Sequence, residues 1–287
     1  MTSQKRRTTL RATAAQFAAS EDWQENLRSA ETQIRQAEAE GTDLLVLPEG
    51  VLARFIGERE RIREHAQPLD GPFVSGLAAA TRGLTVTVVA GIHERSQTSK
   101  PFNTLVVLRR GEVLTTYRKL HLYDAFAMRE SDNVTAADEL PELFDVGGFT
   151  VGLMTCYDVR FPEVARLLAV GGADILVLPA AWVRGPLKEH HWRTLVIARA
   201  LENTVYVVAS GECGEKNIGQ SLIVDPLGVP VAQAGEAPAN ITATLSAERL
   251  AAAREQLPVL ANRRFDVHPK ALQLATFSHP QRKVRTP

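Results

Sequence analysis

Three side chains with complementary chemistry follow apolar segments of the sequence. Glu49 follows the run LLVLP at 44–48, Lys119 follows the segment 113–118, and Cys156 follows the segment 151–155. In a sheet covered by helices, ligands gather beyond the carboxyl ends of the strands. If all three segments are strands, a carboxylate, an ammonium group and a thiol can meet in one pocket.

These three groups together suit acyl transfer. A cysteine is a good nucleophile only as the thiolate, so a nearby base must take its proton. Glu49 can act as that base if burial raises its pKa toward neutrality. Lys119 and the backbone N–H of Tyr157 can hold the oxyanion of a tetrahedral intermediate, where one donor is typically worth about 2.7–4 kcal/mol.

Each of these residues alone also has an ordinary structural interpretation. An isolated cysteine is more often buried and inert, a glutamate after a strand is often a loop carboxylate or a helix cap, and a lysine is usually solvated. The placement of all three behind apolar segments favours a reactive site over three separate coincidences. Cys213 lies in a loop rich in glycine and glutamate and is expected to be a bystander.

The histidines invite a metal-site or a Cys–His interpretation. His121, His190 and His191 show no ligand-like spacing to Cys156, so we expect structural or surface roles for them. A metal-dependent amidase would need a set of ligands that the sequence does not offer. The sequence therefore predicts no metal and no cofactor.

The elements that must position these residues alternate along the chain. Short runs rich in Val, Ile and Leu are typical of buried strands. They predict strands at 10–16, 43–47, 85–92, 104–109, 113–117, 150–155, 174–178, 205–209, 221–225 and 241–245. Amphipathic segments predict helices at 21–40, 73–81, 162–170, 188–203 and 247–256. The pattern favours an α/β sandwich of sheets with helices outside, and a doubly wound sheet is the competing prediction.

Local signals fix several element ends. Pro162 suits a first helical turn and Gly171-Gly172 suits a helix stop. Ser246 can cap the helix after it. Turns are expected at Arg110-Gly111 and at 226–228.

Composition and charge exclude several classes of protein. With 287 residues, 45% of them hydrophobic and 23% charged, the chain is neither disordered, collagen-like nor a coiled coil. Its 33 basic and 33 acidic residues cancel, which argues against holding nucleic acid or a membrane by bulk charge. No apolar run approaches the ~20 residues that span a bilayer.

Two cysteines do not make a disulfide framework, so we expect a reducing compartment, the cytoplasm. Residues 1–8 and 278–287 are expected to be flexible tails on a single domain, 9–277. The basic start lacks the apolar segment of a targeting signal.

Three ordered motifs resemble the signatures of the nitrilase (carbon–nitrogen hydrolase) superfamily. They are LLVLPE at 44–49, YRKLHLYD at 117–124 and CYDVRFPE at 156–163. The resemblance covers about residues 9–266 and includes ADILVLPAAW at 173–182, ARALENTVY at 198–206, SLIVDPLG at 221–228 and Arg263-Arg264.

This resemblance implies a fold and a mechanism. The fold is a four-layer αββα sandwich, and the triad is Glu49 as general base, Lys119 as oxyanion lysine and Cys156 as nucleophile. Glu130 matches a second glutamate that would hydrogen-bond Lys119, although its interval from Lys119 is shorter than in many relatives. The reaction would be hydrolysis of an amide through a thioester, without a cofactor, in a homodimer or a larger assembly.

The residues around the cysteine indicate the substrate class. Nitrile-hydrolysing members typically carry tryptophan after the cysteine and have longer chains, whereas this chain has Tyr157. CYDVRFPE is similar to the ω-amidase and deaminated glutathione amidase branch, which cleaves terminal amides of small carboxylic acids. Arg160 would then bind a substrate carboxylate bidentately, or it would only pair with Asp158 or Glu163.

The rest of the pocket is predicted less directly. Trp182 is expected either to line it or to belong to the core, and Tyr123 is expected to contact substrate. The segments 54–67 and 123–140 are the expected pocket loops. Three alternatives remain: a nitrilase, an N-carbamoyl amino acid amidohydrolase, or a non-catalytic binding or scaffold relative, which the presence of all three triad residues disfavours.

Overall fold

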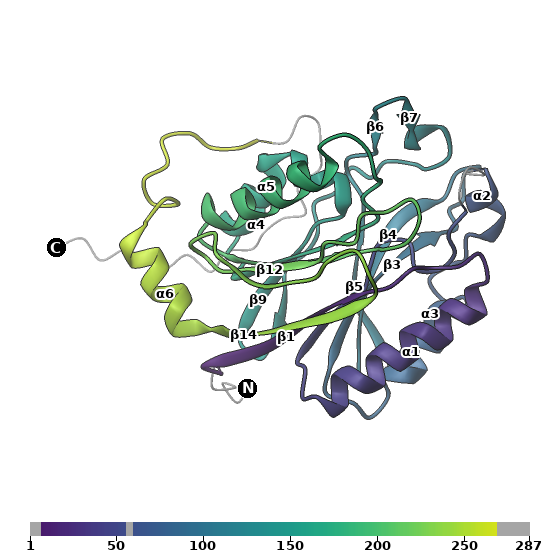
Figure 1. Ribbon diagram of the computed structural model, residues 1–287, viewed down its shortest axis with the longest axis horizontal. Coiled ribbons are helices and arrows are strands. Elements are labelled where there is room, and N and C mark those ends of the chain that lie inside the picture. Colours follow the sequence, from purple (N-terminus) through teal and green to yellow (C-terminus); the bar gives the residue numbers. More distant parts are fainter. Residues whose placement is uncertain (1–6, 56–59, 269–287) are drawn as a thin grey trace.

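A computed structural model describes residues 7–55 and 60–268 of the chain. Two six-stranded sheets lie face to face, and helices cover their outer faces (Figure 1). This arrangement confirms the predicted sandwich and not the doubly wound sheet. The predicted tail 278–287 and most of the tail 1–8 lie outside the described residues.

The first sheet has the strand order β14-β1-β2-β3-β4-β5. The strands β1, β2 and β3 are parallel, and β4, β5 and β14 pair antiparallel with their neighbours. Their bounds are β1 Thr9–Gln16, β2 Leu44–Val46, β3 Thr87–Glu94, β4 Phe102–Arg109, β5 Glu112–Arg118 and β14 Ala239–Ser246.

The second sheet has the order β13-β12-β11-β10-β9-β8, with a parallel centre of β9, β10 and β11. Its bounds are β8 Phe144–Val146, β9 Phe149–Leu153, β10 Ile175–Ala180, β11 Tyr206–Gly211, β12 Leu222–Val224 and β13 Pro230–Gln233. All ten predicted strands are present. The sequence did not predict β8, β13, or the two-stranded hairpin of β6 (Asp124–Ala125) and β7 (Met128–Arg129).

The helices pack on the two outer faces. In Figure 1, α1 and α3 lie against the first sheet and α4 and α5 against the second, while α6 extends beyond the end of β14. Their bounds are α1 Trp23–Ala39, α3 Pro72–Thr81, α4 Pro162–Val170, α5 Lys188–Leu201 and α6 Ala247–Gln256. These five confirm the predicted helices, and a short helix, α2 (Arg61–His65), was not predicted.

Burial on both faces explains why the strands read as continuous apolar runs. Successive side chains of a strand point to opposite faces. In β2 and the residue after it, Leu44 and Val46 pack in the core between the sheets, whereas Leu45 and Leu47 pack in the core under α1 and α3. The central strand β2 therefore has no solvent face that would require polar residues.

Several predicted element ends are confirmed. The hydroxyl of Ser246 accepts a hydrogen bond from Arg249 N at 3.2 Å and caps α6. Pro162 is the first residue of α4. Arg110 and Gly111 both have positive φ, 55° and 89°, and join β4 to β5 in the tight turn that such backbone angles allow.

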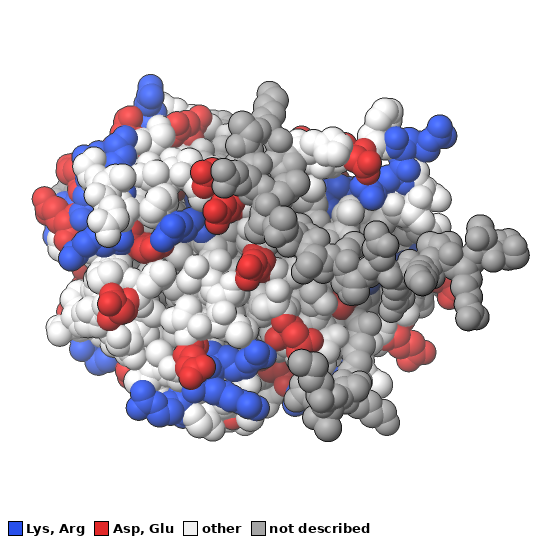
Figure 2. Space-filling model, turned by 180° about the vertical axis from the view of Figure 1, so that it is seen from behind, with Lys and Arg blue, Asp and Glu red and all other residues white. Residues whose placement is uncertain are grey.

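The surface seen in Figure 2 carries acidic and basic side chains side by side around an uncharged central area. No stripe of one sign runs across the described part of this face, in keeping with the equal numbers of acidic and basic residues. None of the helices in the described ranges is long and apolar enough to cross a membrane.

Candidate active site

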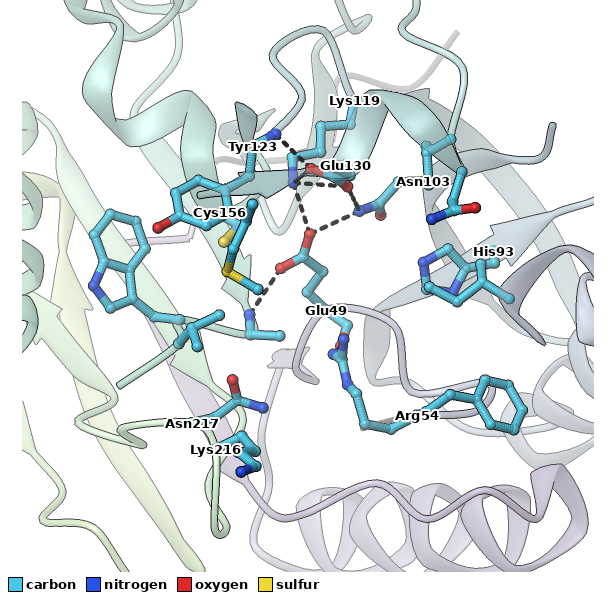
Figure 3. A pocket seen from close by; sticks show the side chains of 18 of the residues that line it. Glu49, Arg54, His93, Asn103, Lys119, Tyr123, Glu130, Cys156, Lys216 and Asn217 are labelled. Atoms are coloured by element: carbon cyan, nitrogen blue, oxygen red, sulfur yellow. Dashed lines mark hydrogen bonds and ion pairs between the residues drawn. The ribbon is translucent and has the colours of Figure 1, made fainter. Parts of the chain in front are cut away.

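A pocket of about 420 Å³ collects residues that follow several strands. It is lined by Glu49 after β2, Lys119 after β5 and Cys156 after β9 (Figure 3). Trp182, after β10, also lines it. A volume of this size suits a small molecule. Both predicted loop segments contribute, since Arg54, Phe55 and Ile62 come from 54–67 and Tyr123, Met128, Glu130, Asn133 and Val134 from 123–140.

Glu49 is held by three donors. Its Oε1 accepts from Lys119 Nζ at 3.0 Å and from Asn103 Nδ2 at 2.7 Å, and its Oε2 accepts from the backbone N–H of Ala181 at 2.8 Å. The loop carrying Glu49 also lies directly against β3. A Cβ at Gly91 would come 2.8 Å from the Cα of Glu49, so only glycine allows this approach without movement.

Lys119 is buried between two carboxylates. Its Nζ lies 3.0 Å from Glu49 Oε1 and 2.9 Å from Glu130 Oε2. Asn103 Nδ2 bridges the same two acids, because it also donates to Glu130 Oε1 at 3.1 Å. The short interval from Lys119 therefore does not keep Glu130 away: η1 (Glu130–Asp132) follows the β6–β7 hairpin and returns the carboxylate to the lysine.

Cys156 stands at a sharp turn from β9 into η2 (Cys156–Arg160). Its φ of +45° is in the left-handed region, which non-glycine residues rarely adopt and which is often found at functional sites. Its side chain lines the pocket beside Glu49 (Figure 3). Tyr157 is the second residue of η2 and lies in its first turn, where backbone N–H groups have no partner within the helix, so its N–H can donate to an oxyanion.

Asp158 fixes the turn that carries Cys156. It is fully buried and accepts hydrogen bonds from the hydroxyl of Tyr117 at 2.7 Å, the N–H of Thr155 at 2.9 Å and Nδ1 of His121 at 2.8 Å. Tyr117 lies in β5, two residues before Lys119. This network therefore ties the cysteine to the strand that carries the lysine, and it gives His121 the structural role that was predicted.

The charges of the pocket set its protonation. Burial raises the pKa of Glu49, but the positive charges of Lys119 and Arg54 outweigh it and lower the pKa from 4.5 to about 2. The expectation that burial brings Glu49 toward neutrality is therefore wrong. Burial lowers the pKa of Lys119, but Glu130 and Glu49 raise it well above its usual value. Burial and the charge of Glu49 raise the pKa of Cys156.

These pKa shifts predict that kcat/KM is nearly independent of pH in the neutral range. Glu49 stays ionised, Lys119 charged and the Cys156 thiol protonated throughout the neutral range. For a neutral amide we expect kcat/KM to change by less than about twofold from pH 5 to 7 and to fall only below about pH 4. Initial rates that already fall as the pH is lowered through 6 would contradict the predicted flat profile of kcat/KM.

The shift in the pKa of Glu49 also affects stability. The pKa of Glu49 is lower in the folded chain than in the unfolded chain, so the contribution of Glu49 to stability is present above pH 4.5 and is lost toward pH 2.

Arg54 holds the other side of Glu49. Its Nη2 donates to the backbone carbonyl of Glu49 at 2.8 Å and pairs with Glu212 at 2.6 Å. Glu212 also accepts from Asn217 Nδ2 at 2.8 Å. Burial and the charge of Arg54 lower the pKa of the neighbouring His93 to about 3, so this histidine is neutral.

The predicted substrate contacts do not all reach the pocket. Tyr123 and Trp182 line it, whereas Arg160 is not among the lining residues. The Arg160 guanidinium lies 4.9 Å from the Trp182 ring and 3.4 Å from Nδ1 of His191. It pairs with neither Asp158 nor Glu163, the two acids that the sequence suggested as alternatives.

The sequence analysis did not single out Asn103 or Lys188, and it placed Arg54 only within the predicted pocket loop 54–67. Asn103 is the second residue of β4, which runs antiparallel to β3, and its pairing with His93 near the end of β3 brings it to the catalytic edge. An asparagine near the beginning of a strand does not by itself indicate a functional site. Lys188 was counted only as the first residue of a helix, although it lines the pocket. No group of His, Cys, Asp and Glu in the described ranges could hold a metal ion.

Known proteins resemble this chain over nearly all its length. The family described as carbon-nitrogen hydrolase matches residues 11–255. The deaminated glutathione amidase of Escherichia coli O157:H7 is 50% identical over 252 residues, 88% of this chain and 96% of that protein. That of Bos taurus is 35% identical over 274 residues, 88% of this chain and 81% of that protein.

Solved structures agree with the fold. Saccharomyces cerevisiae Nit3, a member of branch 10 of the nitrilase superfamily, superposes with a TM-score of 0.80 at 28% identity, covering 92% of this chain and 100% of that one. The C. elegans NitFhit protein gives 0.81 at 28% identity, covering 91% of this chain and 66% of that one. These likenesses confirm the predicted nitrilase-type sandwich, and the family match spans every residue that lines the pocket.

Proposed function

The chain belongs to the carbon–nitrogen hydrolase family, and we propose that its pocket cleaves the amide of a small carboxylate-bearing substrate through a thioester on Cys156. The predicted class, an amidohydrolase, is confirmed by the family and by the relatives. The observation that carries the mechanism is the meeting of Glu49, Lys119 and Cys156 in one pocket.

The first half of the reaction forms the thioester. The sulfur of Cys156 attacks the amide carbon while Glu49 takes the thiol proton, and the electron pair of the carbonyl moves to its oxygen. Lys119 and the N–H of Tyr157 stabilise that oxyanion. When the intermediate collapses, the carbon–nitrogen bond breaks and Glu49 returns the proton to the leaving nitrogen.

The second half releases the acid. Glu49 takes a proton from water, and the resulting hydroxide attacks the thioester carbon. The oxyanion forms again beside Lys119, and its collapse expels the sulfur of Cys156. That sulfur recovers the proton from Glu49, so the site returns to its starting state without a cofactor.

The ion pairs of the pocket explain how an acid with a low pKa acts as the base. Lys119 keeps Glu49 ionised in the free enzyme. As the oxyanion develops, it attracts the charge of Lys119. The lysine then stabilises the ionised form of Glu49 less. The pKa of Glu49 then rises at the stage when Glu49 must carry a proton. Glu130, bonded to Lys119, keeps the lysine in place throughout.

The substrate class follows from the relatives named deaminated glutathione amidase. Deaminated glutathione is an amide of 2-oxoglutarate with cysteinylglycine. Its cleavage gives an acid and a dipeptide amine, whereas a primary ω-amide such as 2-oxoglutaramate gives the acid and ammonia. Both share the 2-oxoglutaryl group, which we propose is the acyl group that Cys156 carries.

The test is a panel in which the acid product is measured by chromatography. It contains deaminated glutathione, 2-oxoglutaramate, succinamate, an N-carbamoyl amino acid and a simple nitrile. We expect turnover of the carboxylate-bearing amides at rates well above those of the last two. Preferred cleavage of the carbamoyl compound or the nitrile would favour those alternatives, and failure to cleave any member would favour a binding or scaffold role.

We propose that the protein forms homodimers or larger homo-oligomers and works in the cytoplasm. The first proposal rests on the homo-oligomeric assembly that is usual for members of this family. The second rests on the two cysteines, which are both free. Analytical ultracentrifugation would test the assembly, and a sedimentation coefficient of a monomer at micromolar concentration would contradict it.

A further inference from the structure

A buried lysine lines the pocket without an acidic partner. Lys188 is the first residue of α5 and is 4% exposed. Its backbone is held in place because Trp182 Nε1 donates to its carbonyl oxygen at 3.0 Å. Across the described ranges of the chain, no carboxylate forms an ion pair with its Nζ. Burying an ammonium group without a counter-charge is costly, so this arrangement requires an explanation.

Aromatic rings and one hydroxyl partly compensate for that cost. Nζ donates to the hydroxyl of Tyr123 at 2.7 Å. It lies 4.7 Å from the Tyr123 ring, 4.6 Å from the Phe126 ring and 5.0 Å from the Trp182 ring. Such contacts attract a cation but do not neutralise it. An ammonium group has three donor hydrogens, and a single hydrogen bond to Tyr123 leaves capacity for an acceptor in the pocket.

The other cations of the pocket all have acidic partners. Lys119 pairs with Glu49 and Glu130, Arg54 pairs with Glu212, and Lys216, which is exposed, lies 3.5 Å from Glu215. Burial and the positive charge of Arg160 both lower the pKa of Lys188, so the two cations repel each other. Together Lys188 and Arg160 make this wall of the pocket positive, next to the reactive sulfur.

We propose that Lys188 binds the carboxylate of the substrate, with Tyr123 and Trp182 packing against the chain between that carboxylate and the amide. This inference rests on the proposed function, because it names the group that selects a carboxylate-bearing amide. An anion entering beside Lys188 supplies the counter-charge that the protein itself does not. Arg160, behind Trp182, then adds to the positive potential rather than contacting the substrate.

Binding, measured without turnover, tests this assignment. In a Cys156→Ala background, calorimetry compares succinamate with its methyl ester, which differ in charge. We expect the acid to bind at least about tenfold more tightly than the ester. Adding Lys188→Met, which keeps most of the side-chain length, is expected to weaken binding of the acid by about 30-fold or more and to change that of the ester by less than threefold.

Matched variants separate charge from structure. Lys216→Met removes the exposed cation of the same pocket and is expected to leave the preference for the acid unchanged. Lys188→Arg keeps the charge and is expected to keep a preference. Thermal unfolding shows whether each variant is folded, and Lys188→Gln replaces Lys188→Met if the latter is not.

Two results would overturn the assignment. One is equal binding of acid and ester to the Cys156→Ala protein, and the other is equal weakening of both by the loss of Lys188. A different outcome would tell against the proposed function alone: a wild-type enzyme that hydrolyses no amide although the acid binds through Lys188. The two failures are therefore distinguishable.

Discussion

The Cys156→Ala variant is expected to lose at least about 10⁴-fold in kcat/KM toward its best amide while remaining folded. Without the sulfur, no thioester forms, and water would have to attack an unactivated amide directly. Removal of this one sulfur atom leaves the ion pairs around Glu49 and Lys119 in place. Rates of acid formation and the midpoint of thermal unfolding measure the two effects separately.

Cys213→Ala is the matched control for this prediction. Cys213 is also free and buried, at 3% exposure against 7% for Cys156, but it does not line the pocket. We expect it to retain kcat/KM within about twofold, since no step involves its sulfur. Equal losses in the two variants would mean that cysteine packing, and not nucleophilic attack, explains the loss.

The Lys119→Met variant is expected to lose both activity and stability. The Nζ of Lys119 lies between Glu49 and Glu130, so its removal leaves one buried and one partly buried carboxylate close together. We expect kcat/KM to fall by about 10³-fold or more because an oxyanion donor is lost. We also expect the free energy of unfolding to fall by about 3–5 kcal/mol, the usual cost of breaking a buried ion pair from one side.

The stability loss should depend on pH in a definite direction. Without Lys119, Arg54 is the remaining positive charge that opposes the effect of burial on Glu49. The pKa of Glu49 in the folded variant is therefore expected to lie above its wild-type value, so the folded variant binds more protons than the folded wild type as the pH falls. Lys119→Met is therefore expected to be most destabilised near pH 8 and to recover part of its stability toward pH 5. Denaturant unfolding at the two pH values measures this. Lys216→Met, whose lysine is exposed, is the control, and an equal deficit at both pH values would contradict the account.

The sequence predicts the strands and helices of this molecule better than the charge interactions of its site. Strands such as β2 are buried on both faces, so their apolar runs are visible without any knowledge of their neighbours. The strands β8 and β13 are short and lie at the two edges of the second sheet, where burial is less uniform and the apolar signal weaker. The hairpin of β6 and β7 has only two residues a strand, too few for any periodicity.

The site was predicted where a residue follows a strand and missed where the fold brings a residue from elsewhere. Glu49, Lys119 and Cys156 share that simple placement, and the structure brings them together. The low pKa of Glu49 depends on Arg54 and Lys119, whose positions relative to it are set by packing. Asn103 reaches the site through antiparallel pairing, and only burial within the fold distinguishes Lys188 from an ordinary surface lysine.

The most direct test of the proposed mechanism is to trap the acyl group on Cys156. Enzyme turning over deaminated glutathione or 2-oxoglutaramate is quenched with acid, and its mass and peptides are analysed. We predict a mass increase equal to the 2-oxoglutaryl group, the same for both substrates, located on the peptide that contains Cys156 and absent from Cys156→Ala. Full turnover with no adduct at any quench time, or an adduct on Cys213, would contradict the thioester mechanism.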